Sequence, residues 1–402
     1  MSFQSTSLQS TTPSLPQGIV ASAAQAGIRA RKSCLDLGLL LSDEARPAAA
    51  LFTQNLLLGA HVPVCREHLQ KSGGMVRAVL VNSGNANCST GVQGLIDNRR
   101  IASALAELIG CPPHEVLYLS TGVIGARLPV EKILGALPEL VGADGQRGIG
   151  AFAQAILTTD MVPKTAGLES TDAAGHPFRI TGIAKGSGMI HPNMATMFGF
   201  LLTDAALPAD SRALLAGVGA RTFNRLTVDG DTSPNDTVIL WSTGTAGEVR
   251  PSALAHGLER IGRDLCRQIA VDGEGATRLV TVRVTGAPTE DAAAHVGRTI
   301  ATSPLIKTAV HGRDPNWGRI LAAAGRAGVR FDPQLAKVWI GPADVYSDGK
   351  PHPENENAAH LHLLNQKEVE LGIHLAAGEA EAEIWTCDFS ADYVRINADY
   401  RS

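Results

Sequence analysis

"GSGMIHPNMATMFGFLLTDA", residues 186–205, joins a glycine-rich polar segment to an apolar run, and Thr196 lies where the two meet. A hydroxyl at that place is unusual for a plain core strand. Thr196 is therefore either a β-branched packing residue or a nucleophile. A threonine hydroxyl is a poor nucleophile unless a base stands beside it.

Two groups could serve as that base. His191 lies nearby in the sequence, but a lone histidine after a turn is more often structural. Cleavage of the peptide bond between Ala195 and Thr196 would instead make Thr196 an N-terminal residue. Its own α-amino group, with a reference pKa of about 7.7 to 8.0, would then be a general base next to the hydroxyl.

Length and charge narrow the class of protein. A chain of 402 residues can bury one large core or two smaller ones, so two lobes are expected. With 18% charged residues and a formal net charge of −4, nothing indicates a nucleic-acid or anionic-membrane partner. A small-molecule ligand is therefore expected.

Cysteine spacing and terminal composition give a cellular context. The six cysteines form no CxxC pair, which indicates reduced thiols and neither a zinc site nor a redox motif. Residues 1–17 are polar and lack the basic region followed by an apolar region that is typical of a secretory signal. We expect a disordered tail there. No apolar run reaches the roughly 18 residues of a membrane span. These features favour the cytoplasm and exclude a membrane role.

Hydrophobic periodicity predicts alternating strands and helices. "MVRAVLVNSGNAN" (75–87) and "EVLYLSTGVIGA" (115–126) are each an apolar strand followed by a small-residue loop. Gly110 is placed to end the helix between them. The buried face of that helix is predicted from four apolar residues, Ile101, Leu105, Leu108 and Ile109.

The later part of the chain predicts an α+β lobe. The apolar spacing over 254–269 indicates an amphipathic helix, and valines at every second position of 280–284 indicate a half-buried strand. "TGAPTED" (285–291) is interpreted as a hinge. Helices to about residue 325 and strands at 336–341 and 369–375 are expected after it.

Clusters of small polar residues are the candidate chemistry. The sequence has no GxSxG elbow, phosphate loop, HExxH or convincing GxGxxG motif. Small side chains in tight loops let backbone N–H groups converge on one developing oxyanion. The same residue types also simply make turns, so both readings stay open for any one cluster. The clusters are "VNSGNAN", "LSTGVIG", "ILTTD", "AKGSGM" and "NMATM".

These clusters resemble those of one known family, the ornithine acetyltransferases, also called glutamate N-acetyltransferases. The resemblance runs from about Gly18 to Ser402 and departs from the family pattern at neither the nucleophile nor the oxyanion positions. It rests on "VNSGNAN", "STGVIG", "LTTD", "AKGSGMIHPNMATM", "FNRLTVDGDTSPNDT", "DGEGAT", "IKTAVHGRDPNWGRI" and "NADYRS".

The resemblance implies a self-cleaving enzyme. The precursor would cut itself between Ala195 and Thr196, giving an α fragment of residues 1–195 and a β fragment of residues 196–402. Thr196 would be the nucleophile that carries the acetyl group. The oxyanion hole would be formed by Thr121 and Gly122, one through its hydroxyl and the other through its backbone N–H.

The resemblance also assigns substrate-binding residues. They are Thr158, Lys185, Thr196, Glu274, Asn397 and Ser402, with Thr158 against Thr159 left open. Lys185 suits the α-carboxylate of an amino acid and Glu274 suits an ammonium group of ornithine. Without the resemblance, Lys185 could equally be a surface charge and Glu274 a helix-end carboxylate. "DPNWGR" (314–319) is interpreted as a structural turn.

The implied reaction is a ping-pong transfer of acetyl from N-acetylornithine to glutamate, releasing ornithine, with no metal or organic cofactor. Acetyl-CoA would be a co-substrate in a bifunctional member. The alternatives are an amidase or aminopeptidase with water as acceptor, a secondary-metabolite acetyltransferase paralogue, and a non-enzymatic scaffold with Thr196 as a buried strand residue.

The fold implied is α+β: a layered α/β/β/α sandwich over residues 18–285, followed by a smaller C-terminal α+β lobe over 286–402 that completes the substrate pocket. An α2β2 heterotetramer of cleaved fragments is expected from the same resemblance.

Overall fold

The computed structural model describes residues 9–10, 13–29, 34–142, 145–191 and 197–399. The chain forms two compact units. The first comprises Met1–Gly186, Asn193–Asn224 and Thr232–Leu265, and the second comprises Ser187–Pro192, Arg225–Asp231 and Cys266–Ser402. The predicted cleavage residues Ala195 and Thr196 and the terminal Ser402 lie outside the described residues.

The first unit is built on two connected layers of β-strands. Strand order along the path is β1-β7-β8-β9-β10-β3-β2-β6, with β4 paired to β3 and β5. The strands are β1 Gln9–Ser10, β2 Ile19–Ala24, β3 Leu37–Phe52, β4 Met75–Asn82, β5 Val116–Ser120, β6 Gln146–Arg147, β7 Lys164–Thr171, β8 Pro177–Lys185, β9 Phe198–Ala205 and β10 Thr237–Gly247.

Strand β3 links the layers because it is long enough to belong to both. Its first half pairs with β2 and β4, and its second half pairs with β10. A register shift between Leu41 and Arg46 separates the two halves. The apolar side chains between the layers come from both, for example Val79 and Leu117 from one and Phe200 and Ile239 from the other.

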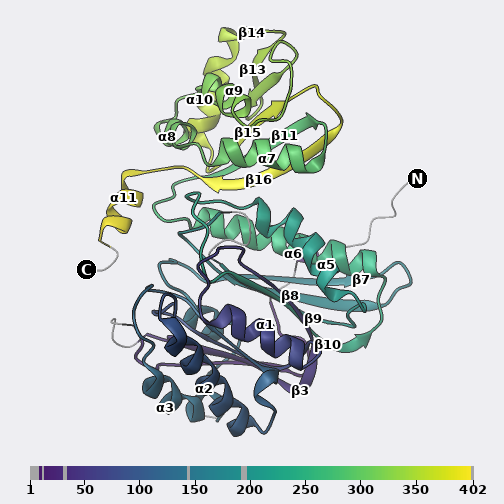
Figure 1. Ribbon diagram of the computed structural model, residues 1–402. Coiled ribbons are helices and arrows are strands. Elements are labelled where there is room, and N and C mark those ends of the chain that lie inside the picture. The colour runs from purple at the N-terminus through teal and green to yellow at the C-terminus, as the bar shows by residue number, and fades with distance from the viewer. Residues whose placement is uncertain (1–8, 11–12, 30–33, 143–144, 192–196, 400–402) are drawn as a thin grey trace. The chain divides into compact units, whose positions relative to one another are not determined.

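Helices cover the two outer faces. α2 and α3 pack against β4 and β5 through one apolar cluster. On the opposite face α6 lies so close to β8 that a Cβ on Gly182 would collide with Ile261. The unit is therefore a layered α/β/β/α sandwich, as predicted (Figure 1). Its helices are α1 His61–Lys71, α2 Gly91–Ile109, η1 Pro113–Glu115, α3 Val130–Val141, α4 Ile149–Ala155, α5 Ser211–Arg221, η2 Phe223–Arg225 and α6 Pro251–Val271. The C-terminal ends of η2 and α6 belong to the second unit.

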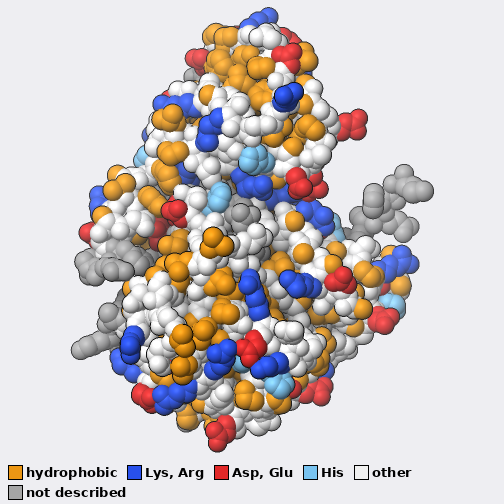
Figure 2. Space-filling view, viewed as in Figure 1, with side chains coloured by type: hydrophobic (Ala, Val, Ile, Leu, Met, Phe, Trp, Pro, Cys, Tyr) orange, Lys and Arg blue, Asp and Glu red, His pale blue; other side chains and the backbone are white. Residues whose placement is uncertain are grey.

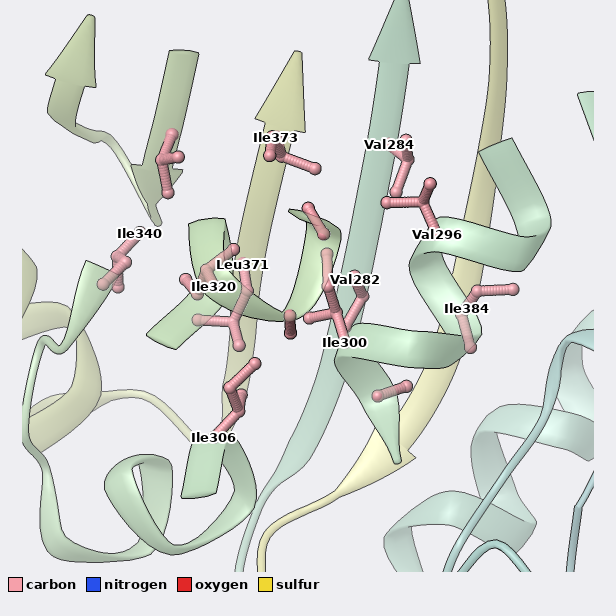
Figure 3. Close-up of a cluster of buried hydrophobic side chains, with 14 of the residues drawn as sticks. Val282, Val284, Val296, Ile300, Ile306, Ile320, Ile340, Leu371, Ile373 and Ile384 are labelled. Atoms are coloured by element: carbon pink, nitrogen blue, oxygen red, sulfur yellow. The ribbon is translucent and has the colours of Figure 1, made fainter. Parts of the chain in front are cut away.

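The second unit is a smaller α+β fold. Its sheet has the order β14-β13-β12-β15-β11-β16. The apolar side chains of α7 pack on β11 and β16, with Val296 and Ile300 beside Val282 and Ile384 (Figure 3). The elements are β11 Leu279–Ala287, α7 Glu290–Ala301, α8 Pro304–Gly312, α9 Trp317–Gly325, β12 Lys337–Ile340, β13 Ala343–Ser347, β14 Lys350–Pro351, η3 Pro353–Asn355, α10 Glu356–Asn365, β15 Glu368–His374, β16 Ala380–Cys387 and α11 Ala391–Ala398.

Several expectations about local structure are confirmed. Gly110 ends α2 in the left-handed conformation, with φ of 69°. Val280, Val282 and Val284 are buried in β11. Leu108, however, is 44% exposed and does not belong to the buried face of α2. The predicted stripe includes it because Ile101, Leu105 and Leu108 share helical spacing, and the packed sheet covers only part of that stripe.

The structure differs from the expected domain limits in two places. Within the predicted disordered tail, Gln9 and Ser10 pair with β7, which gives the edge of that strand hydrogen-bonding partners. The predicted hinge at 285–291 is the end of β11, a turn and the start of α7, and Thr289 caps that helix. The second unit thus contains β11, and it also takes in two short earlier segments that sequence order does not reveal.

The described surface carries charges of both signs. On the face in Figure 2, Lys and Arg side chains are interspersed with Asp and Glu side chains, in keeping with the net charge of −4. Among the described residues, no helix is both long and apolar enough to cross a membrane.

Candidate active site

Two small-residue loops of the first unit begin at the carboxyl ends of neighbouring strands. β4 and β5 are parallel neighbours, with Asn82 paired to Ser120 at their carboxyl ends. The "NSGNAN" loop follows β4 and the "TGVIG" loop follows β5, so they lie side by side. Thr121 begins the second loop, is only 4% exposed, and donates its N–H to the Asn82 carbonyl at 3.0 Å.

Gly122 is at the closest approach of these loops. It has φ of +133°, which favours glycine, and a Cβ there would lie 2.5 Å from the Asn85 nitrogen and nearer still to the Gly84 carbonyl carbon. Any side chain at residue 122 would therefore separate the loops. The backbone of the predicted oxyanion residues is fixed by this contact.

Lys185 connects the opposite layer to the predicted oxyanion hole. It is the last residue of β8 and is 2% exposed, so it is not the surface charge that sequence alone left open. Its Nζ donates to Thr121 Oγ1 at 3.3 Å. The structure thus brings together two residues that are 64 positions apart in the sequence.

Asp160 is a buried carboxylate that connects Thr158 to the backbone that follows Lys185. Its side chain is fully buried, and one oxygen accepts from Lys164 Nζ and from the Gly186 N–H, each at 2.6 Å. The other oxygen accepts the Thr158 N–H at 3.0 Å. Asp160 therefore holds the predicted substrate residue Thr158 and the residue next to Lys185.

The charges around Asp160 keep it ionised. Burial opposes ionisation, but the nearby ammonium groups of Lys185 and Lys164 and the hydrogen bonds outweigh it, and the pKa of Asp160 lies well below its usual range. Arg29 adds a further cation by donating to the carbonyls of Leu157 and Thr158. Positive charge exceeds negative charge here, which suits an anionic ligand.

Asp160 should make stability depend on pH. Because its folded-state pKa is lowered, its ionisation stabilises the fold fully above the unfolded pKa of about 3.9 and less as pH falls below it. Asp160→Asn should therefore lower the free energy of unfolding most at neutral pH. Urea unfolding of both proteins at several pH values checks this, and a difference that stays constant to pH 3 would contradict it.

Two other predicted residues meet in the second unit. Glu274 follows α6, is 6% exposed, and donates its N–H to the Ser187 carbonyl at 3.0 Å. Asn397, on α11, donates its Nδ2 to Glu274 Oε2 at 2.8 Å. A Cβ on Gly188 would lie 2.6 Å from Glu274 Oε1, so the carboxylate lies directly against this backbone.

The structure thus gathers the predicted residues in two groups. Thr121, Gly122, Thr158 and Lys185 belong to the first unit, and Glu274 and Asn397 to the second. Ala195, Thr196 and Ser402 are outside the described residues. The choice between Thr158 and Thr159 stays open as a prediction.

His191, the alternative base, has a structural partner. Its Nδ1 lies 3.2 Å from Thr227 Oγ1, and burial lowers its pKa. Among the described residues, no group of three or more His, Cys, Asp or Glu side chains could hold a metal ion.

Three polar residues are absent from the sequence-based site although they lie within its motifs. Asp160 directly follows the two threonines of "LTTD". Asn235 and Asp236 directly precede the last residue of the "FNRLTVDGDTSPNDT" motif, and both are almost fully buried. A carboxylate or amide inside a matched motif was the available signal. Some of the partners, such as Gly186 for Asp160 and Ser120 for Asn235, lie far away in the sequence.

Comparison with known proteins places this chain in a family. The model of the ArgJ family matches residues 20–402. The chain belongs to the ArgJ family. This confirms the resemblance drawn from the motifs.

Curated ArgJ relatives match over nearly their full length. The "Arginine biosynthesis bifunctional protein ArgJ" of Parasynechococcus marenigrum is 48% identical, covering 96% of this chain and 94% of the relative. The protein of the same name from Thermus thermophilus is 47% identical, covering 96% and 98%. A solved ornithine acetyltransferase from Mycobacterium tuberculosis, complexed with ornithine, is 32% identical over 46% of this chain and 98% of its own, with a TM-score of 0.40.

Proposed function

We propose that this chain transfers the acetyl group of N-acetylornithine to glutamate through an acetyl ester on Thr196, after self-cleavage between Ala195 and Thr196. Membership of the ArgJ family makes the chain an acetyltransferase of arginine biosynthesis. The observation that best supports the proposed site is the contact of buried Lys185 with Thr121, beside an ionised Asp160.

The first half-reaction transfers the acetyl group to the enzyme. Thr196 Oγ attacks the acetyl carbonyl carbon while the α-amino group of Thr196 accepts the hydroxyl proton. Thr121 and Gly122 donate hydrogen bonds to the oxyanion of the tetrahedral intermediate. The C–N bond then breaks, the proton passes to the leaving amine, and ornithine departs.

The second half-reaction is the reverse with another amine. The amino group of glutamate attacks the acetyl ester on Thr196, the same oxyanion donors act again, and the Thr196 Oγ–C bond breaks. Thr196 regains its proton and N-acetylglutamate leaves. No metal or organic cofactor takes part in this proposal.

Substrate recognition follows from the charges. Both substrates carry an α-carboxylate, which we assign to Lys185 because its surroundings hold excess positive charge. Glu274 would bind an ammonium group of ornithine. Thr158, Asn397 and Ser402 would supply directed hydrogen bonds.

Three further points belong to the proposal. The relatives are called bifunctional, and acetyl-CoA is our candidate for a second acetyl donor. The working form would be an α2β2 heterotetramer of cleaved fragments. The enzyme would act in the cytoplasm, where its six thiols stay reduced.

Trapping the acetyl-enzyme tests the function. Purified protein incubated with N-acetylornithine, without glutamate, should gain the mass of one acetyl group on the fragment that begins at Thr196. Added glutamate should remove that mass and appear as N-acetylglutamate. Loss of the acetyl group to water at the same rate with and without glutamate would instead support the amidase alternative.

A further inference from the structure

We propose that Asn235 and Asp236 are positioning residues for the Thr196 reaction. Asn235 fixes the oxyanion loop, and Asp236 fixes Met197, the residue whose nitrogen is bonded to Thr196. This inference rests on the proposed function, because it assumes that Thr196 and the loop at Thr121 react with the same substrate.

Asn235 joins the two small-residue loops at the sheet edge. It is 3% exposed, and its Nδ2 donates to the carbonyls of Ala86 and Ser120, each at 2.6 Å. Ala86 is in the loop after β4, and Ser120 directly precedes Thr121. One amide group therefore sets how far the oxyanion loop lies from its neighbour, using both of its hydrogens.

The backbone that carries Asn235 is also held in place. A Cβ on Gly59 would lie 2.7 Å from Asn235 Oδ1, and the Gly59 N–H donates to the Pro234 carbonyl at 2.9 Å. The buried His61 has its Nε2 2.9 Å from the Asn235 carbonyl oxygen. These contacts hold the backbone at Pro234 and Asn235 and leave no space beside the amide group, whose Oδ1 has no hydrogen-bond partner among the described residues.

Asp236 holds the peptide that follows Thr196. It is 1% exposed, and its Oδ1 accepts the Met197 N–H at 3.0 Å. The Met197 carbonyl accepts the Thr237 N–H at 3.2 Å, so both sides of Met197 are hydrogen-bonded to the segment that begins β10. The start of β9 is thereby fixed.

The second oxygen of Asp236 is buried without a hydrogen-bond partner among the described residues. Such groups are rare in folded proteins and call for an explanation beyond packing. Burial raises the pKa of Asp236 well above its usual value, although the Met197 N–H and the charge of Lys185 oppose the shift.

Asn235 and Asp236 act together because they are consecutive in the sequence. Consecutive residues share a peptide bond, so the separation between the oxyanion loop and Met197 is set by covalent geometry and three hydrogen bonds. Nucleophile and oxyanion donors must be held within a fraction of an ångström for efficient reaction. Asn235 and Asp236 meet that need for groups that come from different strands.

The test compares self-cleavage and transfer in matched variants. Asp236→Leu fills the same space without an acceptor, Asp236→Asn keeps an acceptor for Met197, and Asn235→Ala removes both donated bonds. Asn98→Ala and Asp172→Ala are the controls. Asn98 is a buried amide that donates to the Tyr118 carbonyl, and Asp172 is a buried carboxylate that accepts backbone N–H groups of the β7–β8 turn.

Fragment formation is followed by mass spectrometry after cell-free synthesis, and kcat and KM are measured on cleaved protein. Asp236→Leu and Asn235→Ala should slow self-cleavage and lower kcat by about 100-fold, with KM changed by less than about threefold. Asp236→Asn should retain rates within about fivefold of the parent. Both controls should melt at lower temperature yet cleave and transfer at parental rates.

Three outcomes would overturn the inference. One is parental rates in folded Asp236→Leu and Asn235→Ala, another is equal rate losses in the two controls, and the third is failure of Asp236→Asn to restore the rate. A Thr196→Ala chain that still cleaves would instead defeat the proposed function. The two failures are therefore distinguishable.

Discussion

Thr196→Ala is expected to leave the chain whole and to abolish acetyl transfer. The substitution removes the hydroxyl that attacks during self-cleavage, so no α-amino group is released to act as the base. Loss of a nucleophile and its base together should lower kcat by about 10⁵-fold or more. Intact mass and N-terminal sequencing of the purified proteins check the first part, and an assay of N-acetylglutamate formation checks the second.

Two matched variants serve as controls for Thr196→Ala. Thr196→Ser keeps both a hydroxyl and a future α-amino group, and should still cleave to give a fragment beginning at residue 196. Thr203→Ala removes a buried threonine of β9, whose Oγ1 donates to the Arg179 carbonyl at 2.7 Å, and should leave cleavage intact. A parent protein that remains a single chain would remove the α-amino base and the proposed mechanism with it.

Local structure was predictable where the apolar residues are regularly spaced, as in a strand or an amphipathic helix. Alternating valines in β11 and the apolar spacing of α6 are buried as expected, because each element presents one face to a sheet or helix. Leu108 shows the limit of this reasoning. Helical spacing identifies a stripe, but how much of the stripe is covered depends on the neighbouring elements.

The site was predictable mainly through its motifs. Before any family was named, the small-residue loops after two predicted strands were candidates for either an oxyanion hole or simple turns, and the loops after β4 and β5 do lie together. Their partners could not be read from the sequence. Asn235 is 115 residues from Ser120, and Asp160 is 26 residues from Gly186. Only the strand order of the folded chain brings these groups within hydrogen-bonding distance.

Domain limits were the least predictable feature. The second unit takes in Ser187–Pro192 and Arg225–Asp231 because these segments bond to its other residues, as in the Thr227 N–H to the Trp385 carbonyl and the Glu274 N–H to the Ser187 carbonyl. A composition shift marks neither segment. Domain boundaries predicted from turns and glycines can only divide the chain into consecutive segments. The compact units of the structure are defined by contacts and include non-consecutive segments.

Lys185→Met is expected to weaken binding of both amino-acid substrates because it removes the cation assigned to their α-carboxylate. Lys185 is almost fully buried, and a charge-assisted hydrogen bond in such a site is among the stronger polar contacts. We expect kcat/KM for N-acetylornithine and for glutamate to fall by about 100-fold, mostly through KM. Steady-state kinetics with each substrate measure this directly.

Removing the carboxylate from the substrate separates binding from general damage. The parent enzyme should use the α-carboxamide of N-acetylornithine about 100-fold less well than N-acetylornithine, whereas Lys185→Met should hardly distinguish them. Lys164→Met is the matched control, since Lys164 is also buried and bonded to Asp160. It should lower stability but keep the preference for the carboxylate. If Lys185→Met loses the same factor with both substrates, Lys185 supports the fold around Thr121 and another group binds the carboxylate.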